Sequence, residues 1–237
     1  MKRWMAPTAA RAITIGAAIP LFQSVPISFL DAWLSLWLIL YVIGFALIAL
    51  EGFFFMEEPE IRHPHQFIGA LFATSAIAAI TAAIASSSTL EFSLLENCRE
   101  LLEQRSPWDW CQMALVAAVL YTLAYIAIGM ATWPFVRSYY QDPNKGLKLR
   151  LPSGPVVSSL QMTRGLLTAL ALVPLIASIP PSGMAWWLQL SLLLAAVMAI
   201  APLLMASKWP VKLRLAHAIE ISVFAVIYAY TLWWLLT

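Results

Sequence analysis

Residues 165–207 read GLLTALALVPLIASIPPSGMAWWLQLSLLLAAVMAIAPLLMAS, and none of these side chains carries a charge. A helix needs about 20 mostly apolar residues to cross a bilayer, so a stretch of about 40 residues has room for two crossings. Residues 180–183, Pro-Pro-Ser-Gly, lie in its middle and have the composition of a turn. The stretch therefore predicts two membrane-spanning helices joined by a short turn.

The chain as a whole has the composition of a membrane protein. Of its 237 residues, 62% are hydrophobic and 11% are charged, whereas a soluble domain has about 25% charged residues. This composition excludes a soluble enzyme, a secreted disulfide scaffold and a disordered chain. The formal net charge of +2, with no basic block beside an aromatic platform, argues against a nucleic-acid partner.

Further charge-free windows predict an all-α, multi-pass bundle of about seven transmembrane helices in a single domain over residues 1–237. The first helix is interrupted by Pro20 and Pro26, which each remove a backbone donor, so a re-entrant segment or a signal peptide fits the same residues. The small residues of 69–83 predict a central helix, because small faces permit close helix approach. The predicted spans are residues 12–29, 32–50, 67–86, 112–136, 164–179, 184–206 and 215–236.

Basic residues divide unequally between the two sides of this map. Lysine and arginine near span ends collect on the cytoplasmic side, so the unequal division predicts a cytoplasmic N-terminus and an outside C-terminus. Most tryptophans fall at predicted span ends, as expected for a side chain that prefers the headgroup level. The predicted inner residues are Lys2, Arg3, Arg11, Arg62, Arg137, Lys145, Lys148, Arg150, Arg164, Lys208, Lys212 and Arg214, and the outer ones are Arg99 and Arg105.

The longest outer loop, residues 86–111, contains a predicted amphipathic helix. Over residues 90–103 leucines recur at helical spacing on one side and charged residues lie elsewhere, a pattern typical of a helix lying on the membrane surface. A lid over the bundle is the alternative. Cys98 and Cys111 share this loop. Two cysteines in an oxidising compartment usually pair, so we expect a disulfide that ties this helix to the following span.

Four ionisable residues are predicted at or inside the inner ends of spans. Glu220 lies about one turn inside the last span, and His217, three residues earlier, shares its helix face. Arg164 begins the fifth span and Glu51 ends the second. Ionisable groups at membrane depth are costly and usually face the bundle interior, so the four predict an inner vestibule. Arg164 is expected to reach Glu220 if their helices touch.

This vestibule is compatible with a proton or ion relay, or with an anion site around Arg164. The alternative is that Glu220 is hydrated near the interface and that Arg164 only anchors its helix at the membrane surface. No metal or cofactor site is predicted, because loop histidines beside acidic residues are more typical of a solvated surface than of a zinc site. These residues are His63 and His65, next to Glu57, Glu58 and Glu60.

The sequence favours a non-enzymatic subunit or accessory component of a membrane complex, because it shows no catalytic set and no large loop. A small transporter or channel that uses the vestibule around Arg164, His217 and Glu220 is the first alternative, and a lipid-modifying membrane enzyme is the second. The expected partners are membrane lipids and either other membrane subunits or further copies of the chain. A bacterial inner membrane fits an oxidising outer face best.

Overall fold

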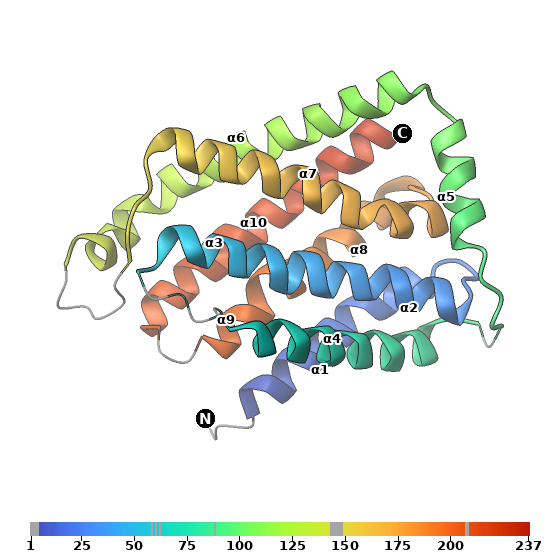
Figure 1. Cartoon of the computed structure of the whole chain (residues 1–237), viewed down its shortest axis with the longest axis horizontal. Coiled ribbons are helices and arrows are strands. Elements are labelled where there is room, and N and C mark those ends of the chain that lie inside the picture. The colour runs from blue at the N-terminus through green and yellow to red at the C-terminus, as the bar shows by residue number, and fades with distance from the viewer. Residues whose placement is uncertain are drawn as a thin grey trace.

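The computed structural model describes residues 5–57, 59, 61, 63–87, 89–142, 149–206 and 209–237, and its regular elements are helical (Figure 1). In chain order these are α1 (Met5–Phe22), α2 (Phe29–Leu38), η1 (Ile39–Ala46), α3 (Leu47–Phe55), α4 (Pro64–Ala85), α5 (Leu94–Glu103), α6 (Pro107–Gln141), α7 (Gly154–Ser178), α8 (Gly183–Ala195), η3 (Ala196–Ile200), α9 (Ala201–Met205) and α10 (Val211–Leu236). The segments η1 and η3 are π-helical turns inside longer helices.

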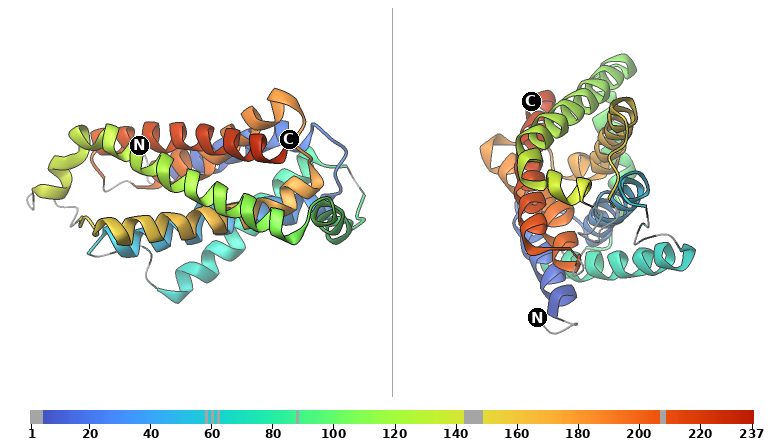
Figure 2. Two further views of the ribbon diagram at one scale, coloured as in Figure 1. Left: turned by 90° about the horizontal axis from the view of Figure 1, so that it is seen from above. Right: turned by 90° about the vertical axis from the view of Figure 1, so that its left-hand side faces the viewer.

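The long helices form a closed ring. Going around it, α6 packs on α7, α7 on α2 and η1, α2 on α4, α4 on α1, and α1 on α8 and α9, while α10 closes the ring between α8 and α6. Figure 2 shows this order in its end-on view. The ring brings helices that are distant in sequence, such as α3, α7 and α10, around one interior.

Six helices in the described part of the chain are long and apolar enough to cross a membrane. They correspond to the second to seventh predicted spans, so the multi-pass α-helical fold is confirmed to that extent. The predicted first span differs, because the helix covers Met5–Phe22 rather than residues 12–29 and its apolar part, Ala6–Phe22, is shorter than the others. The helix ends at Phe22, two residues after Pro20, and an interruption near this proline is what the sequence predicts.

The core is centred on α7 and α8. Leu172, Leu175 and Leu190 are fully buried there, and the predicted turn between the two helices is present. Gly183 has φ of 63° at this turn, a left-handed conformation that glycine adopts without steric cost. Trp186 donates its indole N–H to the carbonyl of Ile179 across the turn, at 2.9 Å. This hydrogen bond joins the end of α7 to the start of α8.

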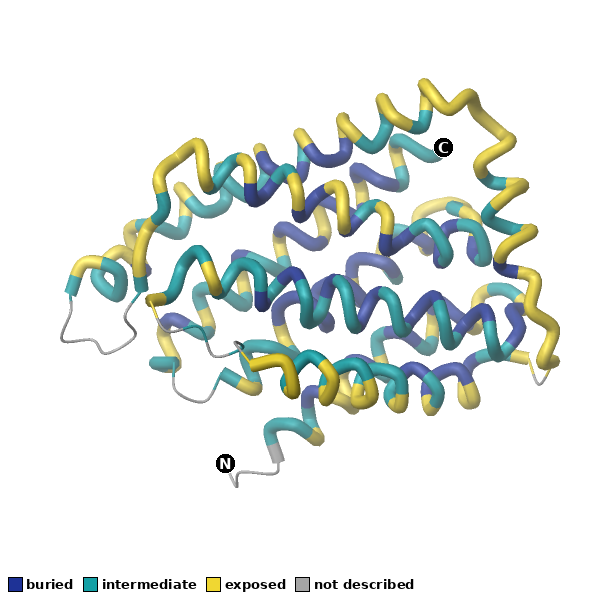
Figure 3. Tube along the Cα trace, in the orientation of Figure 1, coloured by how far each residue is buried: buried dark blue, intermediate teal, exposed yellow. Residues whose placement is uncertain are grey.

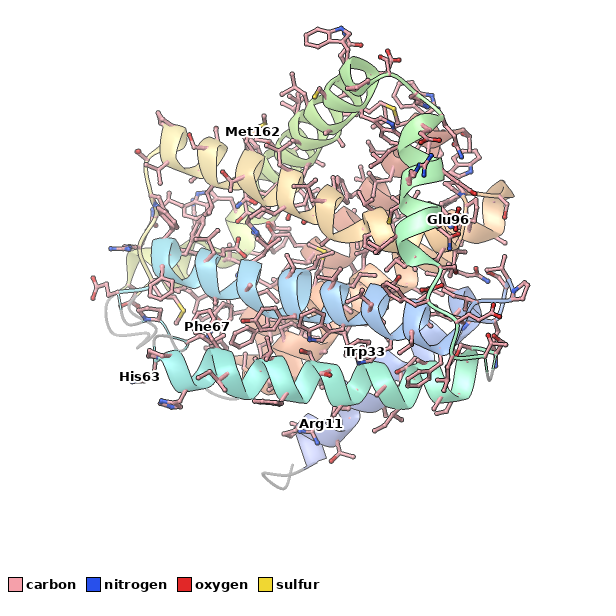
Figure 4. The ribbon with its side chains drawn as sticks, turned by 45° about the vertical axis from the view of Figure 1, so that its right-hand side comes forward. Arg11, Trp33, His63, Phe67, Glu96 and Met162 are labelled. Atoms are coloured by element: carbon pink, nitrogen blue, oxygen red, sulfur yellow. The ribbon has the colours of Figure 1, made fainter. Side chains whose placement is uncertain are left out.

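The prediction that residues 69–83 form the central helix is wrong. α4 is the least buried of the six spanning helices in the described residues, and Figure 3 shows exposed positions along it. Small residues lie on the buried side of α4, as Ala78 and Ala82 do, and also on its exposed side, as Ala73, Ala76 and Ala83 do, so a high content of small residues does not place the helix at the centre. Figure 4 shows Trp33 and Phe67 between α4 and the continuous helix formed by α2, η1 and α3. The indole N–H of Trp33 donates to the carbonyl of Ser75 at 3.3 Å.

The two ends of the bundle carry different elements. The end of α3, the end of α6 and the start of α10 lie at the left in Figure 1, whereas α5 lies across the right-hand end. Arg150 holds the left-hand end of α3, donating Nε to the carbonyl of Phe54 at 2.8 Å and its backbone N–H to that of Phe55 at 2.9 Å. Six of the basic residues used to predict orientation lie outside the described residues, namely Lys2, Arg3, Arg62, Lys145, Lys148 and Lys208. Glu58 and Glu60 lie outside them too.

Helix α5 is tied to α2 by a buried carboxylate. Asp31, only 1% exposed, accepts hydrogen bonds from the Ser93 hydroxyl at 2.6 Å and from the Leu94 backbone N–H at 3.0 Å. A carboxylate at a helix N-terminus satisfies backbone donors that have no partner within the helix. Leu94 is buried against the bundle while Leu95 and Leu102 are exposed, and the placement of α5 on the membrane surface stays a prediction.

Candidate functional site

One large cavity lies inside the ring of helices. Its volume is about 660 Å³ and most of its lining is apolar. All four residues that the sequence singled out line it: Glu51 from α3, Arg164 from α7, and His217 and Glu220 from α10. The lining also includes Met56, Leu149 and Trp209 from the connecting segments at the left-hand end in Figure 1. The four residues therefore line one cavity at the end where α3 stops and α10 begins, and the assignment of this end to the inner side of the membrane stays a prediction.

Among the described charged residues that line this cavity, Arg164 has the smallest exposed fraction. Its Nη1 lies 2.7 Å from Oε1 of Glu51, and the side chains are 6% and 22% exposed. The same Arg164 nitrogen donates to the Gln161 side-chain oxygen at 3.1 Å, and the Tyr125 hydroxyl donates to Glu51 Oε1 at 3.0 Å. Three helices, α3, α6 and α7, thus meet at one ion pair that compensates two otherwise costly buried charges.

A second pair lies on α10. Nδ1 of His217 is 2.9 Å from Oε2 of Glu220, with side chains 16% and 11% exposed. The Trp209 ring lies beside the imidazole, with ring centroids 5.5 Å apart and ring planes inclined at 59°. The other Glu220 oxygen faces α6, where a methyl group at Gly129 would lie 3.7 Å from it. The predicted sharing of one helix face by His217 and Glu220 is present as a direct contact.

The expected contact between Arg164 and Glu220 is not formed. Arg164 pairs with Glu51 rather than with Glu220, because α7 packs directly against η1, which continues into α3. The two carboxylates therefore have different partners, a permanent cation for Glu51 and a titratable imidazole for Glu220. A carboxylate that shares a proton with an imidazole changes its net charge with pH, whereas one paired with arginine does not.

Several side-chain nitrogen atoms near this site have no hydrogen-bond partner among the described residues. They are Nε of Arg164, Nε2 of Gln161 and Nε2 of His217, all buried. Buried polar atoms are normally hydrogen-bonded, and those that are not call for an explanation such as a bound water or ligand. The site therefore has unused capacity to bind a polar group.

The wall of the cavity contains two π-helical segments that face each other. Gly44 in η1 and Val197 in η3 both line the cavity, and a Cβ at Gly44 would lie 2.6 Å from Cγ1 of Val197. Single π-helical turns inside α-helices occur frequently at functional sites. Here they bring two spanning helices together at a point where glycine alone fits.

Sequence reasoning missed Tyr125 and Gln161, which bind the Arg164–Glu51 pair, and Asp31, which holds α5. Neutral polar residues inside an apolar span carry no distinctive spacing, so no sequence signal identifies Tyr125 or Gln161. Asp31 marks only the start of a span in the sequence. Its three-residue spacing from Ser28, whose hydroxyl accepts the Asp31 backbone N–H, is the helix-start pattern that could have indicated a buried cap.

The predicted disulfide is not formed. Cys98 and Cys111 are both free thiols, the first half-buried and the second exposed. Cys98 lies in α5, which packs across the end of the bundle on α7, whereas Cys111 lies in the first turns of α6. The change of direction between these helices separates the two sulfur atoms, although the residues are close in sequence. Burial, and to a lesser degree the Asp31 carboxylate, raises the pKa of the Cys98 thiol.

We expect a maleimide to label Cys111 several times faster than Cys98 at pH 7. The thiolate is the reacting form, and a raised pKa keeps Cys98 protonated until the pH rises further than an ordinary thiol requires. Labelling of Cys98 should therefore increase at higher pH than labelling of Cys111. Mass spectrometry of labelled peptides between pH 7 and 10 measures both rates. Equal profiles, or a Cys98–Cys111 peptide under non-reducing conditions, would contradict the structure.

Comparison of the chain with protein-family models, with curated proteins and with solved structures finds no match in any of the three. The function is therefore argued from the geometry of the cavity and from the chemistry of the side chains that line it.

Proposed function

We propose that this integral membrane protein is a small transporter whose substrate binds in the central cavity beside the two ion pairs. The observation that carries the proposal is the convergence of Glu51, Arg164, His217 and Glu220 on one cavity of about 660 Å³. Ionisable residues within spanning helices typically mark substrate or ion pathways. The volume is within the range of cavities that bind small molecules, about 300–1,000 Å³.

The helices around the cavity are interrupted. Two of them contain π-helical turns, η1 and η3, and η3 is followed by α9, whose second residue is Pro202. Interrupted helices can build the binding site of a transporter. By the positive-inside rule we assign the end with the ion pairs to the cytoplasm. Association with other membrane subunits stays a prediction from the sequence.

Access to the cavity from both sides of the membrane tests the proposal. In a background with Cys98→Ser and Cys111→Ser, we expect Thr74→Cys, which lines the cavity, to react quickly with a membrane-impermeant methanethiosulfonate from the cytoplasmic side. Slower labelling from the outer side is also expected, because a transporter must open its site to both. Inside-out and right-side-out vesicles separate the two rates.

The matched control is Ala82→Cys, on the same helix α4, buried to 2% exposure and outside the cavity lining. It should resist the reagent from either side. If Thr74→Cys is labelled from one side only, transport is wrong. If it resists like Ala82→Cys, the cavity is closed to solvent and the proposal fails.

A further inference from the structure

We propose, resting on the transport function above, that the substrate is an apolar organic cation that binds against Glu220 in exchange for a proton. The charges, the aromatic rings and the histidine of the cavity each support one part of this statement. An anion and a neutral lipid are less compatible with the same groups.

Among the described residues that line the cavity, Glu220 is the carboxylate that no arginine or lysine neutralises. Glu51 is neutralised by Arg164 at 2.7 Å. The hydrogen-bond and ion-pair partner of Glu220 among the described residues is His217, and a neutral imidazole leaves the carboxylate charge unmatched. Arg11 also lines the cavity, but Figure 4 shows it on the part of α1 that projects beyond α4, and its side chain is exposed. A cation entering the cavity therefore finds an acceptor that costs no existing ion pair.

Aromatic side chains line the cavity next to this pair. Trp209 lies beside His217, with ring centroids 5.5 Å apart and ring planes inclined at 59°, and Phe224, four residues after Glu220 on the same helix, meets Tyr121 edge to face at 4.5 Å. Both Trp209 and Phe224 line the cavity. The faces of aromatic rings attract cations and exclude water, which favours a cation whose charge is spread over an apolar body.

An anion fits the cavity poorly. Among the described lining residues the one buried cation is Arg164, which already uses Nη1 to bind both Glu51 and Gln161. An anion would have to displace Glu51 and would be repelled by Glu220. A neutral lipid carries no charge that could replace the proton on His217, so it would leave Glu220 uncompensated whenever His217 is neutral, which is costly in an apolar cavity.

Proton exchange follows from the His217–Glu220 pair. A protonated His217 compensates Glu220, and the pair is then neutral. When a monovalent cation takes over this role, the pair releases that proton, so cation and proton compete for one charge. Neither α8, η3 nor α9 contributes a titratable side chain. Among the described residues, the titratable and charged groups that line the cavity on other elements are Glu51, Tyr121, Tyr125, Tyr140 and Arg164, together with the exposed Arg11.

Binding of radiolabelled tetraphenylphosphonium to the full chain in nanodiscs, with empty nanodiscs as blank, tests the proposal. We expect saturable binding at pH 8 that weakens at least tenfold at pH 5.5, and release of about one proton per cation bound in weakly buffered solution. Glu220→Gln should weaken binding at pH 8 at least tenfold and abolish the proton release. It keeps a hydrogen-bonding oxygen for His217, and a single symmetric peak on gel filtration verifies its fold.

The matched control is Glu96→Gln in α5 (Figure 4), a residue that is not part of the cavity lining. It should bind the cation as the unchanged protein does. Tetraphenylborate, an anion of the same shape, should not compete. Equal binding by Glu220→Gln, binding that is independent of pH, or displacement by tetraphenylborate would each overturn the proposal. If tetraphenylphosphonium does not bind although Thr74→Cys is labelled from both sides, the cation is wrong and the transport function stands.

Discussion

Replacing Arg164 with methionine lowers the free energy of unfolding by about 3 kcal/mol, because it leaves Glu51 charged and unpaired inside the bundle. Arg164 is 6% exposed and Glu51 22% exposed, so solvent compensates little of the lost interaction. The estimate takes the lower end of the range for broken buried pairs, since Tyr125 still donates to Glu51. Unfolding in mixed micelles, followed by loss of helical circular dichroism, measures the change.

The double replacement Glu51→Met with Arg164→Met should recover most of this loss. Exchanging a whole buried ion pair for apolar side chains of similar size is often neutral, whereas removing one partner is not. Arg99→Met is the matched control, because Arg99 and Glu103 lie 2.7 Å apart but are 75% and 62% exposed. An exposed pair of this kind contributes about 0.5 kcal/mol or less. A loss for Arg99→Met as large as for Arg164→Met would show that burial is not the cause.

The contrast between these two pairs indicates which properties of the site could be predicted. Charged residues within apolar runs are conspicuous, so Arg164 and Glu220 stand out in the sequence and both line the cavity. Which charges pair depends on which helices touch, and helices that are apolar on all sides carry no signal for their neighbours. For that reason the sequence offers an Arg164–Glu220 contact only on the condition that their helices touch, whereas the structure has Arg164–Glu51.

The same reasoning explains the other differences in the fold. Six spans are predictable because length and hydropathy alone determine them. The peripheral position of α4, the free thiols of Cys98 and Cys111 and the π-helical turns all depend on contacts between helices. Hydrophobic periodicity separates a core from water, but a membrane helix faces lipid that is as apolar as its neighbours. The sequence therefore does not indicate which face of such a helix is packed.

Gly165→Ala destabilises the bundle by about 2 kcal/mol, within the range of about 1–3 kcal/mol expected for over-packing. A Cβ at this position would lie 2.9 Å from Cα of Ala118 and 2.9 Å from Cβ of Tyr121. Backbone atoms cannot rotate away, so α6 and α7 must move apart. The Gly165 carbonyl also accepts the Tyr228 hydroxyl at 3.2 Å, so the shift weakens the contact with α10. Thermal unfolding in detergent gives the direction of the change.

The control has the opposite expected sign. Gly16 in α1 has no atom within 4 Å of an added Cβ, and alanine in an open helical position is favoured over glycine by about 0.5–1 kcal/mol. Gly16→Ala should therefore be neutral or stabilising, although it makes the same chemical change as Gly165→Ala. Arg164 is adjacent to Gly165, so the displacement should also loosen the ion pair with Glu51. If Gly165→Ala stabilises as Gly16→Ala does, α6 and α7 are not in close contact, and the position of Arg164 in the cavity loses its support.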